Sequence, residues 1–362
     1  MGNRLFQTLS AQENEIINFN QNYADSFLVK RYFKAGHLFN FHSWAPLYID
    51  IDRNAAAPGA IIFTQNLLST CTGKAGYSYD AIEGTGKYVA GIEYAGFYPV
   101  LNTQVEYGDR KLSMAGSDSK ISAKEKNVVS GISLPFSFSK SRFYTQIKLF
   151  AHSNYMDIKP LNDSMDNISA HALDYGFSFY NSAFSSHRDI YPKYAQILQL
   201  RYAHSPLSNN NMGEMGGIYG SLYFPGFKKN NSFYITAAYQ KRNADKYAFS
   251  FLYALPRGFY TIDENYNSMF KSSFNYALPL LYPDISLGPL MYIKRLRSEL
   301  FFDYAILTDK KNYLRSYGMD VTTDLHLFRF IAPIELGLRS VYRQNDRKWL
   351  FEPLFAVGFD NL

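Results

Sequence analysis

Apolar and polar residues alternate with a period of two along most of this 362-residue chain. In one segment, Leu101, Val105 and Tyr107 alternate with Asn102 and Glu106. The same pattern returns in the segments that begin at Phe143, Leu290, Tyr317 and Phe351. Successive side chains of a β-strand point to opposite faces of a sheet, so this period predicts strands with one apolar and one polar face.

The length of the alternating segments separates two kinds of β protein. A soluble sandwich also alternates, but its strands commonly have about 5–6 residues. Several segments here run to about 10 residues or more, which is the length with which a tilted strand crosses a bilayer. The sequence therefore favours an all-β fold, a transmembrane antiparallel β-barrel, over a soluble all-β fold.

The segments predict about 16 strands, an even number as is usual in single-chain outer-membrane barrels. They lie at 37–50, 60–69, 73–82, 87–96, 99–109, 126–135, 142–153, 169–181, 193–204, 216–224, 232–242, 268–279, 288–306, 312–329, 332–343 and 349–360. An open sheet edge in lipid would leave backbone groups unpaired, so we expect the first strand to pair with the last.

The connections between these strands differ in length. Three are short and carry proline or small polar residues: "PFSFSKSR", "FPGFKKNNS" and "LLYPDISLGP". Three others are longer and polar: "DRKLSMAGSDSKISAKEKN", "HSNYMDIKPLNDSMDN" and "PLSNNNMGEMG". Short turns at one rim and long loops at the other are typical of bacterial outer-membrane barrels.

The first 35 residues do not share the alternation. We interpret residues 1–35 as an N-terminal linker or the tail of an upstream periplasmic region, and residues 36–362 as the barrel. The start, "MGNRLFQTLS", lacks the basic-then-apolar layout of a secretory signal, so we expect that a leader or upstream region has been removed.

Composition agrees with a barrel and excludes a helical membrane protein. The chain has 31 Tyr and 30 Phe, and its mean hydropathy is −0.25. No apolar run approaches the roughly 18 residues of a membrane helix. Alternating strands keep the mean hydropathy low, while aromatic girdles at the two membrane interfaces raise the Tyr and Phe content.

Charge and candidate chemistry exclude other classes. The net charge of +6 comes without a Lys/Arg block, so we expect no nucleic-acid partner. Cys71 is the single cysteine and the seven histidines show no metal-ligand spacing, so we expect no metal, no other cofactor and no catalytic residues. A repeated "AHS" at His152 and His204 leaves one enzymatic alternative, a barrel-embedded lipid hydrolase with a Ser–His pair, although no third orienting group is identifiable.

The longest connection, roughly residues 243–267, contains the unusually apolar stretch "YAFSFLYALPRGF". Water would penalise so many exposed Phe, Tyr and Leu side chains, so we expect this loop to fold back into the barrel. It would carry Arg257 into a partly desolvated lumen, where an unpaired charge costs several kcal/mol. Arg257 therefore needs a carboxylate partner.

Alternation supplies the candidates. Asp303 shares its face with Arg295, Arg297 and Glu299, while the apolar Leu300 lies on the opposite face. Asp320 and Asp324 on the next strand also point inward by the same count. We expect Asp303, Asp320 and Asp324 to be the acidic partners in the lumen, and Asp303 has an alternative pairing with Arg295 or Arg297.

Two short motifs carry a family resemblance. Arg257, Gly258 and Phe259 in the long loop, followed by Phe301-x-Asp303-x-Ala305 on a strand, resemble the motifs of the BamA/TamA superfamily. In place of the final Ala of the second motif the family has Gly. The superfamily comprises outer-membrane insertases and two-partner secretion transporters with sixteen-stranded barrels. The resemblance implies that Arg257 pairs with Asp303 inside the barrel.

Other segments extend this resemblance over roughly residues 37–362. The ending "FEPLFAVGFDNL" resembles the alternating aromatic signal by which such barrels are recognised for assembly, although it ends on Leu362. "HLFNFHSWAPLYIDID" and "ALPLLYPDISLGPLMYIKRLR" resemble barrels of the superfamily from Bacteroidetes-type bacteria. In those proteins the barrel follows a periplasmic β-propeller.

The resemblance implies a non-enzymatic function at the bacterial outer membrane, the insertion or translocation of proteins. Outer-membrane lipid, client proteins and a periplasmic accessory domain are the implied partners. Pro46 in the first strand removes one backbone donor and favours an edge, which a client strand could join. The alternative is a passive or gated channel, with Arg295, Arg297, Glu299, Asp320 and Asp324 as its lining.

Overall fold

The computed structural model describes most of the chain. The described residues are 33–50, 55–81, 83–113, 120–161, 166–186, 188–206, 211–245, 247–260, 266–309, 311–327 and 333–357. The chain divides into two compact units, Met1–His37 and Leu38–Leu362. The predicted linker 1–35 lies almost wholly outside the described residues and stays a prediction; the short 3₁₀ helix η1 (Lys34–His37) begins at its end.

The unit Leu38–Leu362 is one antiparallel sheet of 17 strands, so the predicted all-β class is confirmed. The strands are β1 (Phe41–Asp50), β2 (Ala55–Gln65), β3 (Cys71–Asp80), β4 (Thr85–Tyr94), β5 (Val100–Ser113), β6 (Lys120–Lys140), β7 (Phe143–Pro160), β8 (Ile168–Ala183), β9 (Ala195–His204), β10 (Glu214–Pro225), β11 (Ser232–Asn243), β12 (Ser268–Leu281), β13 (Ile285–Leu287), β14 (Met291–Leu307), β15 (Asn312–Leu327), β16 (Ile334–Arg343) and β17 (Lys348–Val357). No helix in the described ranges is long and apolar enough to cross a membrane.

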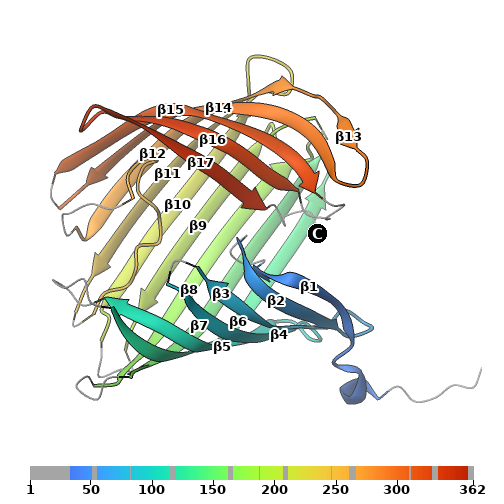
Figure 1. Ribbon diagram of the computed structural model, residues 1–362, viewed down its shortest axis with the longest axis vertical. Coiled ribbons are helices and arrows are strands. Elements are labelled where there is room, and N and C mark those ends of the chain that lie inside the picture. Colours follow the sequence, from blue (N-terminus) through green and yellow to red (C-terminus); the bar gives the residue numbers. More distant parts are fainter. Residues whose placement is uncertain are drawn as a thin grey trace, which may run out of the picture. The chain divides into compact units, whose positions relative to one another are not determined.

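The strand count agrees with the sequence apart from β13. This three-residue strand pairs with the start of β14, while β12 pairs directly with the rest of β14. The other 16 strands pair with their neighbours in chain order, each hairpin with the next (Figure 1). Most of these pairings are local because a short connection joins the two strands, whereas a long loop separates β11 from β12.

The predicted closure of the sheet is wrong. Within the described ranges, β1 has a paired register with β2 alone and β17 with β16 alone. The last strand approaches β2, but no register joins them. Closure is the one pairing that no hairpin turn dictates, because the two strands lie at opposite ends of the sequence. The sheet therefore keeps two free edges.

The connection between β11 and β12 identifies the two faces of the curled sheet (Figure 1). We call the concave face, which this loop contacts, the inner face. A Cβ added to Gly217 of β10 would lie 2.7 Å from Leu252 of the loop, so Gly217 faces inward. Arg201 pairs with Gly217 and also faces inward, and its neighbours Leu200 and Tyr202 therefore face outward.

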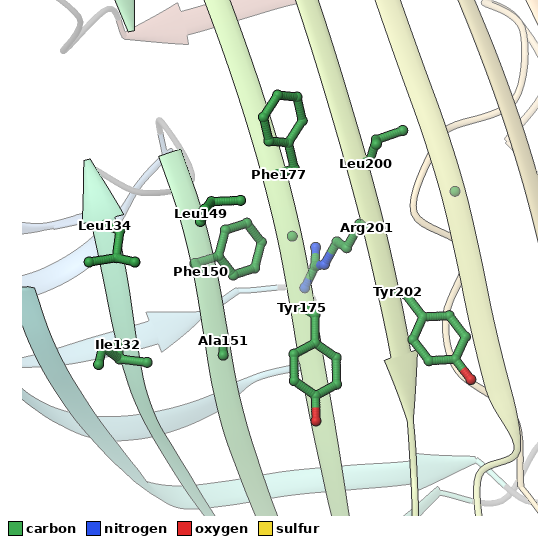
Figure 2. Close-up of a pocket in the computed structure, with 12 residues that line it drawn as sticks. Ile132, Leu134, Leu149, Phe150, Ala151, Tyr175, Phe177, Leu200, Arg201 and Tyr202 are labelled. Carbon is green, nitrogen blue, oxygen red and sulfur yellow. The ribbon is translucent and has the colours of Figure 1, made fainter. Parts of the chain in front are cut away.

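The outer face carries an apolar band, which β6 shows most clearly. Between the outward lysines Lys126 and Lys140, its outward positions are Val128, Ser130, Ile132, Leu134, Phe136 and Phe138. That stretch is about 11 residues, the length of a strand that crosses a bilayer at a tilt. Large apolar side chains continue at the same level on β7 to β9 (Figure 2).

Strand direction places the three short connections at one rim, the turn rim, and the three long ones at the other, the loop rim. Two corrections apply at the loop rim. Much of the two longer polar loops predicted after β5 and β7 is strand, since β5 and β6 remain paired as far as Ser113 and β7 runs to Pro160. The β14–β15 and β16–β17 turns at this rim are short as well. At the loop rim the strands extend beyond the apolar band, and their residues there are mostly polar. Strand pairing therefore continues past the last apolar position of the band.

Candidate functional site

The long loop between β11 and β12 lies against the inner face because wall side chains satisfy its backbone. Gln240, which is fully buried, donates to the carbonyl of Tyr253 at 3.0 Å and accepts from its N–H at 2.8 Å. The ammonium of Lys271 donates to the carbonyl of Leu255 at 3.0 Å. The Gln240 amide thus makes the two hydrogen bonds that a neighbouring strand would make to the backbone of Tyr253. The loop can therefore be buried without leaving these backbone groups unsatisfied.

Apolar packing stabilises the same loop. Phe251, Leu255 and Phe259 pack against a buried cluster that consists of Tyr266, just before β12, and of Met269, Ala305, Leu307 and Leu314 on β12, β14 and β15. The Phe251 ring stacks on Tyr266 with centroids 4.3 Å apart. The apolar composition of the loop is therefore explained by burial against the wall.

The tip of the loop is a tight turn. The N–H of Phe259 donates to the carbonyl of Pro256 at 3.1 Å. Gly258 has a φ of 85°, in the left-handed region, and an added Cβ would lie 3.1 Å from Val341 of β16. Arg343 donates to the Gly258 carbonyl at 3.3 Å and lies over the Phe259 ring. The left-handed conformation favours glycine here, and a larger residue would have to displace Val341 slightly.

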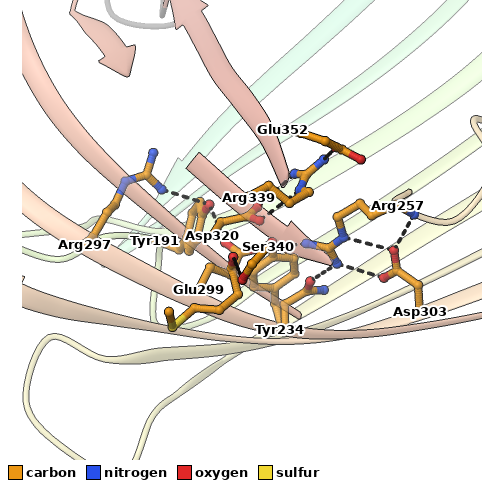
Figure 3. A network of polar contacts seen from close by, with 12 residues as sticks. Tyr191, Tyr234, Arg257, Arg297, Glu299, Asp303, Asp320, Arg339, Ser340 and Glu352 are labelled. Carbon is orange, nitrogen blue, oxygen red and sulfur yellow. Dashed lines mark hydrogen bonds and ion pairs between the residues drawn. The ribbon is translucent and has the colours of Figure 1, made fainter. Parts of the chain in front are cut away.

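Arg257 makes the central contact of the site (Figure 3). Its Nε and Nη2 donate to the two carboxylate oxygens of Asp303 at 2.9 and 2.8 Å, and its own backbone N–H donates to the same carboxylate at 2.9 Å. Asp303 is completely buried and the Arg257 side chain is 17% exposed. The guanidinium also lies 3.8 Å from the Phe301 ring centroid and donates to Asn275. A bidentate pair with a stacked ring fixes both position and angle.

Glu299 is a second carboxylate of the site. It accepts from Nη1 of Arg257 at 3.2 Å and from the hydroxyl of Tyr234 on β11 at 2.6 Å. Its side chain is 12% exposed. Arg257 therefore bridges β12, through Asn275, and β14, through Asp303 and Glu299.

Asp320 and Asp324 lie on the inner face, as the alternation predicted, and their partners are arginines other than Arg257. Asp320 accepts from Arg339 of β16 at 2.8 Å in both contacts. Asp324 accepts from Arg295 and, at 3.0 Å, from Arg297. The strand register decides this, since it places Asp324 opposite Arg295 and Asp320 opposite Arg339.

The alternative pairing of Asp303 with Arg295 or Arg297 is wrong for the same reason. Asp303 stands opposite Ser316, away from both arginines along β14. Arg297 also pairs with Glu335 at 2.6 Å, and Arg339 also reaches Glu352 at 3.7 Å. These ion pairs join β14 to β17 across the inner face (Figure 3).

The sequence missed a second loop in this network. Tyr191, in the connection between β8 and β9 at the turn rim, donates to Glu299 at 3.0 Å and accepts from Arg297 at 3.1 Å. In the same connection the carbonyl of Asp189 accepts from Arg295 at 2.8 Å. Glu299 is therefore bound by one residue from each rim, Arg257 from the loop rim and Tyr191 from the turn rim. Two features of the sequence could have indicated that this connection folds inward: its unusual length for the turn rim, and the apolar Ile190 beside Tyr191.

Other chemistry is sparse. No group of three or more His, Cys, Asp or Glu side chains in the described ranges could hold a metal ion. His152 and His204, the histidines of the hydrolase alternative, stack on Phe150 and Tyr175. A different pair, Ser153 and His171 on the outer face, is 2.8 Å apart, but Nδ1 of that histidine has no hydrogen-bond partner in the described part of the chain. The orienting group of a catalytic triad is missing there.

Comparison with known proteins gives the fold. The sequence matches no protein-family model and none of the curated proteins. Its structure is similar to BamA from Haemophilus ducreyi lacking POTRA domains 1-3, with a TM-score of 0.50 and 14% identity over 83% of this chain and 67% of that one. The protein has the BamA-like barrel fold. CdiB from Escherichia coli is also similar, with a TM-score of 0.52 and 9% identity over 83% of this chain.

CdiB from Acinetobacter baumannii gives a TM-score of 0.50 at 8% identity. This chain spans 59% and 55% of the lengths of the two CdiB chains. The resemblance predicted from Arg257-Gly258-Phe259 and Phe301-x-Asp303-x-Ala305 is thus confirmed for the fold. Ala305 stands where the motif has Gly, and it is fully buried in the cluster beneath the loop, where its methyl group is accommodated. A preceding β-propeller stays a prediction.

Proposed function

We propose that this BamA-like barrel lies in the bacterial outer membrane and acts in the insertion or translocation of proteins there. The apolar outer band, about 11 residues long on β6, supports a membrane location, because its height matches the hydrocarbon core. Client proteins and a periplasmic accessory domain are the proposed partners.

The free edges of β1 and β17 carry the proposal. Both strands present unpaired backbone groups on one side in the described part of the chain. Large side chains are exposed beside them, with Trp44 71% and Phe351 76% exposed. A client strand with matching alternation would satisfy the backbone groups by β-augmentation and cover the apolar side chains.

The interior supports an insertion or translocation role over a passive channel. Arg257 enters from the loop rim and Tyr191 from the turn rim, and both bind Glu299. The charges proposed as a channel lining, Arg295, Arg297, Glu299, Asp320 and Asp324, are all engaged in ion pairs or hydrogen bonds within the network. Two loops occupy the lumen, and its charged side chains are bound to each other. This arrangement favours binding of a client at the sheet edge over passage of a solute through the lumen.

Site-specific photocrosslinking tests the proposal. A photoreactive residue in place of Trp44 or Phe351 should crosslink to newly made outer-membrane proteins. The matched control is Phe274 on β12, which is 43% exposed on the outer face within a fully paired wall. Equal crosslinking at all three positions would contradict a role for the seam. Steady conductance in planar bilayers that survives Arg257→Ala would favour the channel.

A further inference from the structure

A shallow apolar groove lies on the outer face of β6 to β9 (Figure 2). Its volume is about 490 Å³, and its outward lining includes Ile132, Leu149, Ala151, Tyr175, Leu200 and Tyr202. The strand register explains the hollow. Ala151 stands between Ile132 on one side and Tyr175 on the other, so a single methyl group lies in a row of large side chains. The groove is therefore built into the wall by one small residue.

Toward the loop rim, the outward positions of the same strands become basic and aromatic. Lys126 stands opposite Tyr107 on β5 and Asp157 on β7, and Tyr107 is 50% exposed. Two further lysines on this surface are compensated, Lys124 by Asp109 at 2.5 Å and Lys159 by Asp157 at 3.7 Å. Lys126 is exposed and has no ion pair in the described part of the chain. Lys124, Lys126 and Lys159 together face the two carboxylates Asp109 and Asp157, which leaves one net positive charge among these five residues.

The spacing between the two features matches one leaflet of a bilayer. Lys126 and Ile132 lie on the same face of β6, six positions apart, which is about 20 Å along a strand. At a strand tilt of about 45° this becomes a depth of about 14 Å, close to half of a hydrocarbon core of about 30 Å. The lysine thus lies at the interface when the groove lies near the midplane.

We infer that this surface is a binding site for a membrane phospholipid with a net negative charge, held by Lys126 at its phosphate and by the groove at one acyl chain. Tyr107 and Tyr155, which is 40% exposed, flank the phosphate position at the depth where amphipathic rings are favoured. The inference rests on the proposed membrane location. It gives β6 to β9 a fixed lipid contact on a part of the wall remote in sequence from β17.

Native mass spectrometry of the full chain tests the site. The protein is reconstituted in nanodiscs of phosphatidylcholine with a minor fraction of phosphatidylglycerol and then released into detergent. The natural chain should retain phosphatidylglycerol in preference to phosphatidylcholine. Lys126→Glu should lower that preference by about fivefold or more, the effect of one basic residue at an anionic surface. Ala151→Trp, which fills the hollow, should lower retention of both lipids.

Two matched variants control for general surface effects. Lys241→Glu changes an exposed lysine near the loop rim of β11, and Ala237→Trp enlarges an exposed alanine on the outer face of the same strand. Neither should change lipid retention. Equal effects of the test and control variants would overturn the site, and so would phosphatidylglycerol retention that Lys126→Glu leaves intact.

Two readouts keep folding and membrane insertion separate from lipid binding. Heat-modifiable migration on gels reports whether each variant forms the folded barrel, and Lys126→Gln provides a milder change if Lys126→Glu fails to fold. A chain that remains soluble and monomeric without detergent would overturn the proposed function itself. A chain that is embedded in nanodiscs but shows no lipid preference would overturn this inference alone.

Discussion

The inner face of β12 to β16 and the free edges of β1 and β17 differ in how their polar groups are satisfied. On the inner face, buried carboxylates such as Asp303 have their charges paired within the fold. At the edges, the backbone groups of β1 and β17 lack a strand partner on one side within the described ranges. The comparison teaches that polar groups are satisfied within the fold in one part of the wall and lack partners in another. Another chain can bind most easily where polar groups still lack partners.

The largest effect is expected when the Arg257–Asp303 ion pair on the inner face is removed. Arg257→Ala leaves Asp303 buried and unpaired, which should destabilise the docked loop by about 3–5 kcal/mol. Limited proteolysis should then cut the loop at residues that are protected in the natural chain. The exchanged variant, Arg257→Asp with Asp303→Arg, should recover part of the protection. Arg315→Ala serves as the control, because that exposed arginine lies over Tyr304 and has no ion pair in the described part of the chain.

The same experiment tests the partner assignment. Asp303→Ala should reproduce the Arg257 defect, whereas Asp320→Ala and Asp324→Ala should leave the loop protected, since their partners are Arg339, Arg295 and Arg297. A loop released by Asp324→Ala and not by Asp303→Ala would show that the geometry of Figure 3 is not the one in solution.

A smaller effect concerns the second loop. Tyr191→Phe keeps the ring but removes the hydroxyl between Glu299 and Arg297, at a cost of about 1–3 kcal/mol for the polar groups left unsatisfied. Trypsin cleavage after Arg188 or Lys193 should become faster. Tyr194→Phe is the matched control, since Tyr194 is 42% exposed and its ring contacts Arg142. Equal cleavage of both variants would contradict a specific role for the Tyr191 hydroxyl.

The turn at the loop tip gives the next prediction. Gly258→Ala forces a Cβ into the left-handed region and against Val341, which should cost about 1–2 kcal/mol. The loss should appear as a lower denaturant midpoint for loop release. Gly288→Ala is a useful control because its φ is also positive, at 58°, while nothing lies within 4 Å of its added Cβ. Gly288 lies outside the loop, so Gly288→Ala should leave the midpoint for loop release unchanged.

The smallest effect concerns the departure from the family motif. Ala305→Gly should destabilise the wall beneath the loop by about 0.5–1 kcal/mol, because glycine in a strand loses more conformational freedom on folding. The buried methyl group in the cluster with Met269 and Leu307 is also lost. Thermal unfolding of the two proteins in the same detergent measures the change. A more stable Ala305→Gly protein would mean that the alanine is strained in this chain.

Sequence reasoning could find Arg257 and Asp303 because both depend on short-range rules. Alternation places Asp303 inward, and the apolar content of the loop predicts its burial. It could not assign Asp320 and Asp324 to their arginines, because that requires the register between β14, β15 and β16. It could not find Tyr191 either, since Tyr191 and Glu299 lie 108 residues apart in the chain.

By itself, the sequence determined the strands, their faces and their neighbours, because a period of two and a short turn are local properties. Only the tertiary structure decided which charges meet, that a loop from each rim reaches Glu299, and that β1 and β17 do not pair with each other in the described part of the chain. Those outcomes depend on contacts between distant segments, whose geometry follows from the curvature and register of the whole sheet.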